Sequence, residues 1–257
     1  MSEPLDDQQV VDVLTRVVGI IDPVLEVLSS TDPLGIKGRT KDDSPANSLA
    51  DRGLDAVAWA FNAADVPGTK AWDEKNVDER CKWWVRRVGA LNNLVVAFPN
   101  VLGPLAQRLP LQKMLGFANQ AIVLVAIARE RGIEDRHDQV RLLAQVLCQR
   151  TIPDDVEPGP NATPPVGEVP VTLKGSGEKD ENGWAPLALA RTLWRLADTM
   201  RGLSGELERR PKPGKFFRYL GMVPVVGVAA GYVGEFSALT HAAEAGRQWV
   251  DAQHRAG

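Results

Sequence analysis

Residues with chemical potential are few and scattered along this chain of 257 residues. The three histidines are His137, His241 and His254, and only His241 has a second potential metal ligand at helical spacing, Glu244. Two ligands on one helix face do not complete a metal site, which needs at least a third. The chain also lacks the His-Glu-x-x-His and Cys-x-x-Cys patterns of metal-binding proteins. We therefore predict no metal site and no cofactor.

Two glycine-containing segments resemble catalytic loops only in part. The segment Gly35-Ile-Lys-Gly-Arg-Thr lacks the Gly-x4-Gly-Lys-Ser/Thr spacing of a phosphate loop, and no predicted strand precedes it. Gly202-Leu-Ser-Gly lacks the spacing of a nucleophile elbow. The aspartate pairs at 42–43 and 154–155 fall in polar or proline-rich loops, where carboxylates are solvated. We therefore predict no catalytic residue and a protein that is not an enzyme.

A basic and aromatic segment precedes the C-terminal region. Six basic and two acidic residues give residues 201–219 a net charge of +4, in a chain whose net charge is −3. The uncharged, glycine-rich residues 220–234 follow. Basic and aromatic residues leading into an apolar segment are typical of a membrane interface. We predict that anionic lipid is contacted by Arg209, Arg210, Lys212, Lys215, Phe216, Phe217, Arg218 and Tyr219.

The energy available to this segment is sufficient for reversible membrane binding. Each basic residue near an anionic leaflet contributes about 1 kcal/mol, and each fully buried phenylalanine adds roughly 1.5–3 kcal/mol. The alternative is a solvated connector whose phenylalanines fill the protein's own core. Gly227 and Gly231 form a Gly-x-x-x-Gly pair that permits close helix packing in lipid or in water.

A second group of basic and aromatic residues is predicted as a secondary interface. It consists of Lys82, Trp83, Trp84, Arg86 and Arg87. The alternative is that the tryptophans lie at the edge of the core while the long basic side chains extend past them to water.

The apolar spacing predicts an all-α protein. Helical periodicity covers residues 8–30, 46–64, 73–98, 111–131, 135–150, 184–208 and 225–254, and no segment shows the alternation of a strand. Pro23 should kink or divide the first helix. Residues 121–128 are apolar on every face, which predicts a central buried helix, and Gly132 should end that helix.

The helices are predicted to form one domain. Residues 1–150 form an N-terminal helical part, and 151–183 form an extended, mobile loop rich in proline and glycine. Residues 184–257 form a C-terminal helical hairpin that packs on the first part. The predicted architecture is a bundle of about seven or eight helices.

Composition excludes several classes of protein. The net charge of −3 argues against nucleic-acid binding by bulk electrostatics. Cys81 and Cys148 are predicted to be reduced and buried, as in cytoplasmic proteins. The chain has no run of about 18 apolar residues and no secretory signal, so we expect no ordinary transmembrane helix. We predict a cytoplasmic location, peripheral on the inner face of the cell membrane.

Two segments resemble the EcsC family, α-helical bacterial proteins named from an ABC-transporter operon. Residues 115–147 are similar to the buried helix of that family, which ends at a glycine and is followed by a helix with arginine and paired aliphatic residues. Residues 220–231 resemble its near-terminal segment Ile/Val-Pro-x-x-Gly-x-x-x-Gly. The resemblance implies a helical fold and an association with membrane or transport processes, without catalytic residues.

The favoured function is therefore a non-enzymatic, membrane-peripheral protein that modulates a membrane or transport partner. Its partners would be an anionic membrane surface or a membrane protein. The alternative is a soluble protein–protein interaction module or homo-oligomeric scaffold, with residues 98–105 and 151–183 as contact surfaces.

Overall fold

The computed structural model describes residues 5–29, 65–91, 111–160, 162, 184–203 and 226–256. This part of the chain is helical and contains no strand, so the predicted all-α class is confirmed. Its elements are α1 (Asp7–Leu28), α3 (Lys70–Asp73), α4 (Val77–Gly89), α6 (Leu111–Glu130), α7 (Arg136–Leu143), the π-helical turn η3 (Ala144–Cys148), α8 (Trp184–Arg201) and α11 (Val226–Ala256).

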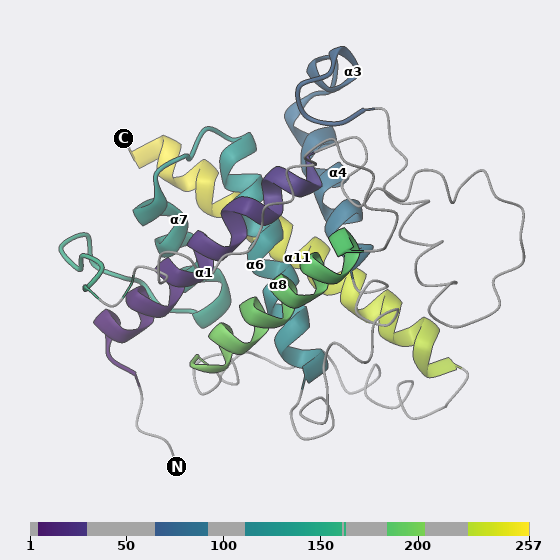
Figure 1. The fold of residues 1–257 in the computed structure, drawn as a ribbon. Helices are drawn as coiled ribbons and strands as arrows, with labels where there is room; N and C mark the ends of the chain where they lie inside the picture. Colours follow the sequence, from purple (N-terminus) through teal and green to yellow (C-terminus); the bar gives the residue numbers. More distant parts are fainter. Residues whose placement is uncertain are drawn as a thin grey trace, which may run out of the picture.

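Helix α6 is the centre of the bundle. All eight side chains from Ala121 to Ala128 are at most 1% exposed. Helices α1, α4, α7, α8 and α11 pack against α6, with α1 and α8 in front of it and α11 behind it in Figure 1. Burial of each Val, Leu or Ile contributes about 1.5–3 kcal/mol. The predicted central buried helix is confirmed.

Helix α1 begins with a capping box and continues through its proline. The Asp6 side chain accepts a hydrogen bond from the Gln9 backbone, and the Gln9 side chain accepts one from the Asp6 backbone. Pro23 removes one backbone hydrogen bond, yet it does not divide the helix. Buried apolar residues on both sides of Pro23, including Ile21 and Val24, hold the two parts of α1 against the same core.

The helix predicted over residues 73–98 begins later than expected. Asn76 forms a capping box with Glu79 and starts α4 at Val77, after the separate short helix α3. The polar pair provides hydrogen-bond partners for two backbone N–H groups that would otherwise be unsatisfied, which fixes the start of the helix at that point. Residues 92–98 and the helix predicted over 46–64 lie outside the described residues.

The connection from α6 to α7 depends on a glycine. Gly132 has a φ of +85°, the left-handed conformation that ends α6 as predicted. Asp135 then accepts a hydrogen bond from the Asp138 backbone and caps α7. The helix predicted over 135–150 instead changes from α to π geometry at Ala144 and ends at Gln149, whose φ is +53°.

The start of the predicted mobile loop packs on α1. The Gly159 N–H donates to the Asp12 carboxylate over 2.8 Å, and Gln8 Nε2 donates to the Glu157 carbonyl over 2.7 Å. Ile152 is 2% exposed and anchors this segment in the core. Residues 151–160 therefore make both apolar and polar contacts with the bundle, and the mobility of residues 151–183 stays a prediction. Residues 163–183 lie outside the described part.

The C-terminal part of the chain was predicted to pack on the first part, and both cysteines were predicted to be reduced and buried. Helices α8 and α11 both pack on α6, and the connector at 204–225 lies outside the described residues. Cys81 and Cys148 are free and buried, as predicted.

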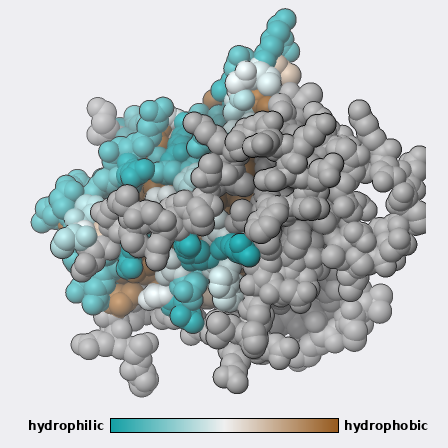
Figure 2. All heavy atoms as spheres, in the orientation of Figure 1, coloured by the Kyte–Doolittle hydropathy of each residue, from teal (hydrophilic) through white to brown (hydrophobic). Residues whose placement is uncertain are grey.

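Among the described helices, none has the length and apolar character needed to cross a membrane. The described residues on the face shown in Figure 2 are largely hydrophilic, and Val77 is the one exposed large apolar side chain among the described residues.

The close approach of α11 to α6 is testable at Gly246. A Cβ at this position would lie 2.7 Å from the buried Leu124 Cδ2. Overpacking costs about 1–3 kcal/mol, more than the roughly 0.5–1 kcal/mol that alanine gains over glycine in a helix. We expect Gly246→Ala to lower the free energy of unfolding by about 1–2 kcal/mol in urea titrations. Gly202→Ala is the control, because its Cβ would meet only ordinary contacts. Equal stability of the two variants would contradict the packing described here.

Candidate functional site

The main predicted interface is the basic and aromatic segment 209–219. The structure describes the helices before and after this segment in the sequence, but not the segment itself. Residues 209–219, which contain all eight predicted lipid contacts, lie outside the described residues. Helix α8 ends before this segment at Arg201, and α11 begins after it at Val226. Gly227 and Gly231 lie in the first turns of α11, where the structure describes the backbone alone.

The predicted secondary interface is divided between the surface and the core. Trp83, Trp84 and Arg87 are 7%, 4% and 2% exposed, whereas Lys82 and Arg86 are exposed. Residues 82 and 86 are four apart and share one side of α4, while the other three residues lie on the side that packs on the bundle. These five residues therefore do not form one surface. The alternative, with the tryptophans at the edge of the core and the basic side chains extending to water, fits Lys82 and Arg86 but not Arg87, which is buried with both tryptophans.

The buried side of α4 carries a cluster of aromatic and basic residues. Trp83 makes edge contacts with Trp72 and Trp84, at centroid distances of 4.9 and 5.0 Å. The Arg87 guanidinium lies 4.7 Å from the centre of the Trp83 ring, and its Nε donates to the Leu28 carbonyl over 3.1 Å. Burial lowers the pKa of Arg87 to about 10, so it stays charged at neutral pH. A cation thus meets the carbonyl end of α1, where the helix dipole is negative.

A carboxylate lies close to this cluster. Lys75 Nζ is 2.7 Å from an Asp65 carboxylate oxygen, and this hydrogen bond lowers the pKa of Asp65 below its ordinary value of 3.8. The positive charge of Lys75 and a hydrogen bond from Trp83 act in the same direction, while partial burial opposes them. Asp65 also interacts electrostatically with Arg87. The segment before α3 is thereby connected to α4.

An ionic cluster joins α4, α6 and α11. The Arg131 guanidinium lies 3.2 Å from Asp78 and 2.6 Å from Asp251, and Arg247 reaches the same Asp78 oxygen at 3.1 Å. Cys81 is buried beside these groups. Burial raises the pKa of the Cys81 thiol more than Arg131 lowers it, so the thiol is protonated at neutral pH. A protonated, buried thiol is a poor nucleophile, and the ion pairs around it join three separate parts of the chain.

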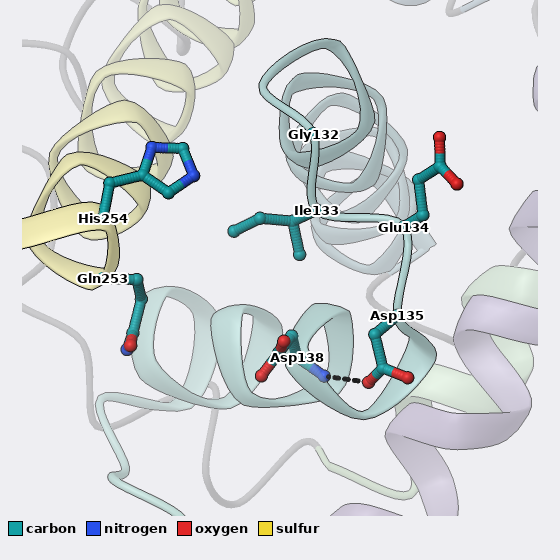
Figure 3. Close-up of a pocket in the computed structure, with 7 residues that line it drawn as sticks. All are labelled: Gly132, Ile133, Glu134, Asp135, Asp138, Gln253 and His254. Atoms are coloured by element: carbon teal, nitrogen blue, oxygen red, sulfur yellow. Dashed lines mark hydrogen bonds between the residues drawn. The ribbon is translucent and has the colours of Figure 1, made fainter. Parts of the chain in front are cut away.

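A groove lies beside this cluster, between α7 and the end of α11. Its volume is about 400 Å³. In Figure 3, Ile133 and His254 point into the space between α11 and the α6–α7 connection. Asp135 caps α7, and Asp138 lies 3.5 Å from Arg141, so both carboxylates already have partners. The residues that line the groove are Gly132, Ile133, Glu134, Asp135, Asp138, Gln253 and His254.

Metal-ligand geometry is lacking from the part of the chain that the structure describes. No group of three His, Cys, Asp or Glu side chains converges within the described ranges. His241 donates from Nδ1 to the Ser237 carbonyl over 2.7 Å, and Glu244 accepts from Gln248 over 3.1 Å. The pair at 241 and 244 is therefore occupied by local helix contacts.

Sequence reasoning missed the ionic cluster and the groove. Both combine residues from helices that are far apart in the chain, such as Asp78 and Asp251. The one local signal was the pair Arg247 and Asp251, which are four residues apart on α11. That spacing predicts an exposed helix face and does not identify its partners on α4 and α6.

Comparison with known proteins adds no assignment. No family model matches the chain, and no match was found among curated proteins or solved structures. Membership of the EcsC family stays a prediction.

The contrast between Arg87 and Arg86 gives a matched test of α4. Arg87→Gln removes a buried cation, its hydrogen bond to Leu28 and its contact with Trp83. We expect the free energy of unfolding to fall by about 2–4 kcal/mol. The neighbouring exposed variant Arg86→Gln should stay within about 0.5 kcal/mol of the native chain. Urea unfolding followed by circular dichroism measures both, and equal losses would contradict the assignment of Arg87 to the core.

The lowered pKa of Asp65 predicts a pH dependence. The ionised carboxylate stabilises the fold above pH 3.8, and this contribution declines as the pH falls through the lower folded-state pKa. The stability advantage of the native chain over Asp65→Asn should therefore shrink below pH 3.8. The same comparison in a Lys75→Gln background should give a smaller advantage at neutral pH. An advantage that is unchanged from neutral to acidic pH would rule out this hydrogen bond as its source.

Proposed function

We propose that this chain is a non-enzymatic protein that binds reversibly to anionic membrane surfaces and modulates a membrane or transport partner. The observation that supports the proposal most directly is the separation of charge along the chain. Residues 201–219 have a net charge of +4 while the whole chain has −3, which leaves −7 for the other residues. Local positive charge in an acidic protein directs binding to one part of the molecule.

The pairing of charges in the bundle supports the same conclusion. Many described cations are neutralised by neighbouring carboxylates, and Asp22 accepts both Arg129 and Arg136. Paired cations of this kind contribute to the fold and have little residual attraction for an external surface. The basic segment contains only two carboxylates for its six cations. It therefore has excess positive charge to interact with lipid phosphates.

The apolar component of binding points to the same segment. The described surface offers little apolar area, since Val77 is its one exposed large apolar residue. Trp83 and Trp84 are buried against the bundle. Phe216 and Phe217 therefore remain the aromatic residues proposed to enter the interface, where each would contribute up to roughly 1.5–3 kcal/mol.

The helices on either side of the segment would give it a firm attachment. Helix α8 leads into it and α11 follows it, and both pack on the buried helix α6. Functional residues often lie in connections that are held by a rigid scaffold. The similarity of residues 115–147 and 220–231 to the EcsC family supports a membrane or transport partner.

The test is vesicle co-sedimentation with a charge-reversed variant. Arg209→Glu, Arg210→Glu, Lys212→Glu and Lys215→Glu, combined in one chain, should abolish binding to vesicles of phosphatidylcholine and phosphatidylserine. Native binding should weaken with added salt, because salt screens the attraction. Neutral phosphatidylcholine vesicles should bind weakly or not at all.

A charge-preserving variant is the matched control. Arg209→Lys, Arg210→Lys, Lys212→Arg and Lys215→Arg keep all four charges and should retain binding. Unchanged binding of the charge-reversed chain, with native helicity by circular dichroism, would refute the role of this segment. A native chain that binds no vesicles but forms stable oligomers by light scattering would favour the homo-oligomeric scaffold instead.

A further inference from the structure

Helix α8 presents an exposed basic face next to the proposed membrane segment. Arg191 and Arg201 are exposed, and Trp194 and Arg195 are partly exposed. We propose that this face of α8 contacts anionic phospholipid headgroups and extends the membrane-binding surface into the folded bundle. This inference rests on the proposed function, and it assigns part of the surface to residues whose positions the structure describes.

Helix geometry places these residues together. Positions 191, 194, 195, 198 and 201 recur at intervals of three and four residues, which puts them on one side of a helix. The remaining side packs on α1 and α6. Its buried side chains are Leu189, Ala190, Thr192, Leu193, Leu196, Ala197 and Met200. The rise of an α-helix gives the exposed face a length of about 15 Å from residue 191 to residue 201.

The cations of this face are poorly neutralised. Asp198 is the only carboxylate of α8, and it lies 3.0 Å from Arg201. Arg191 and Arg195 form no ion pair with a carboxylate of the described residues. By contrast, Arg131, Arg141 and many other described cations have carboxylate partners. These two guanidinium groups, which have no carboxylate partner within the described ranges, are therefore proposed to bind phosphate oxygens, with which arginine forms strong paired hydrogen bonds.

The aromatic residue on this face favours a lipid surface over other anions. Trp194 lies between Arg191 and Arg195 on α8 and is only partly buried. Tryptophan is enriched at membrane–water interfaces, where its ring lies at the level of the headgroups. Figure 1 shows α8 at the front of the bundle, and hydrophilic atoms cover part of this region in Figure 2. In the sequence, this face is followed at once by the rest of the basic segment 201–219.

The test compares two double variants of the full chain. Arg191→Gln with Arg195→Gln removes two charges from α8, and Lys70→Gln with Arg255→Gln removes two from α3 and the end of α11. Each charge near an anionic leaflet changes affinity about fivefold. We expect the α8 variant to bind vesicles of phosphatidylcholine and phosphatidylserine about 10- to 30-fold more weakly than the native chain. The control variant should bind like the native chain, and circular dichroism should show all three folded.

Fluorescence quenching by brominated lipid gives an independent readout. The native chain should be quenched on binding, and Trp194→Phe should lose a measurable part of that quenching at equal bound fraction. Unchanged quenching in Trp194→Phe would show that Trp194 does not lie in the membrane interface.

The outcomes separate this inference from the proposed function. If the α8 variant binds as tightly as the control while charge reversal at 209–215 abolishes binding, the inference fails and the proposed function stands. If only the α8 variant loses binding, the inference stands and the segment 209–215 is not the contact. If the native chain binds no vesicles, both fail. Preferred binding of duplex DNA over vesicles, lost equally in the α8 variant, would assign the face to nucleic acid and overturn the inference.

Discussion

The burial of α6 on all of its sides is the constraint on which the bundle depends. Residues 121–128 have no polar face, so any exposed side would leave several large apolar side chains in water. In the described part of the chain, five other helices therefore surround α6, and each must present an apolar side to it. Their polar sides face outward as a consequence. The groups available to partners lie on these outer sides and in the connections between the helices.

Charges near the core mainly join helices to one another. Arg87 is placed inside the bundle, where removal from water is costly, and it is compensated by the Leu28 carbonyl, the Trp83 ring and nearby Asp65. The Arg131 cluster likewise connects α4, α6 and α11. Cations used in this way specify how the helices pack. This internal use distinguishes them from the cations of α8, which have few carboxylates around them.

The sequence predicted what depends on local patterns. Uninterrupted apolar character over 121–128 identified the central helix, and Gly132 identified its end, because both signals act within a few residues. The predictions failed where tertiary contacts decide. Pro23 was expected to kink or divide the first helix, and it does not divide α1, because packing on both sides of it outweighs one lost hydrogen bond. The contacts of residues 151–160 were not predicted either, because the Asp12 carboxylate that accepts the Gly159 N–H belongs to a residue far away in the chain.

The candidate site shows the same limit. Trp83, Trp84 and Arg87 have the composition of a membrane interface, and a list of residue types does not tell which side of α4 faces the core. Their spacing relative to Lys82 and Arg86 shows that the five residues lie on two different sides of α4. Which of the two sides is buried follows only from the packing of the neighbouring helices. The basic face of α8 was missed for the opposite reason. The apolar spacing of residues 184–208 predicted a helix and its buried side. It gave no role to the arginines on the exposed side.

The distribution of charge also bears on how a bound molecule would be oriented. Acidic residues concentrate at the start of α1 and in the segment that packs on it, including Asp6, Asp7, Asp154, Asp155 and Glu157. Arg150 and Arg141 neutralise only part of this charge. A negative surface would attract the proposed basic face of α8 and repel these carboxylates, which lie near the end of α8 because a Cβ on Gly202 would contact Val13 of α1. In the proposed membrane-bound state, Arg191 and Arg195 would therefore have to lie closer to the surface than the carboxylates at the start of α1, which would set the tilt of the bundle.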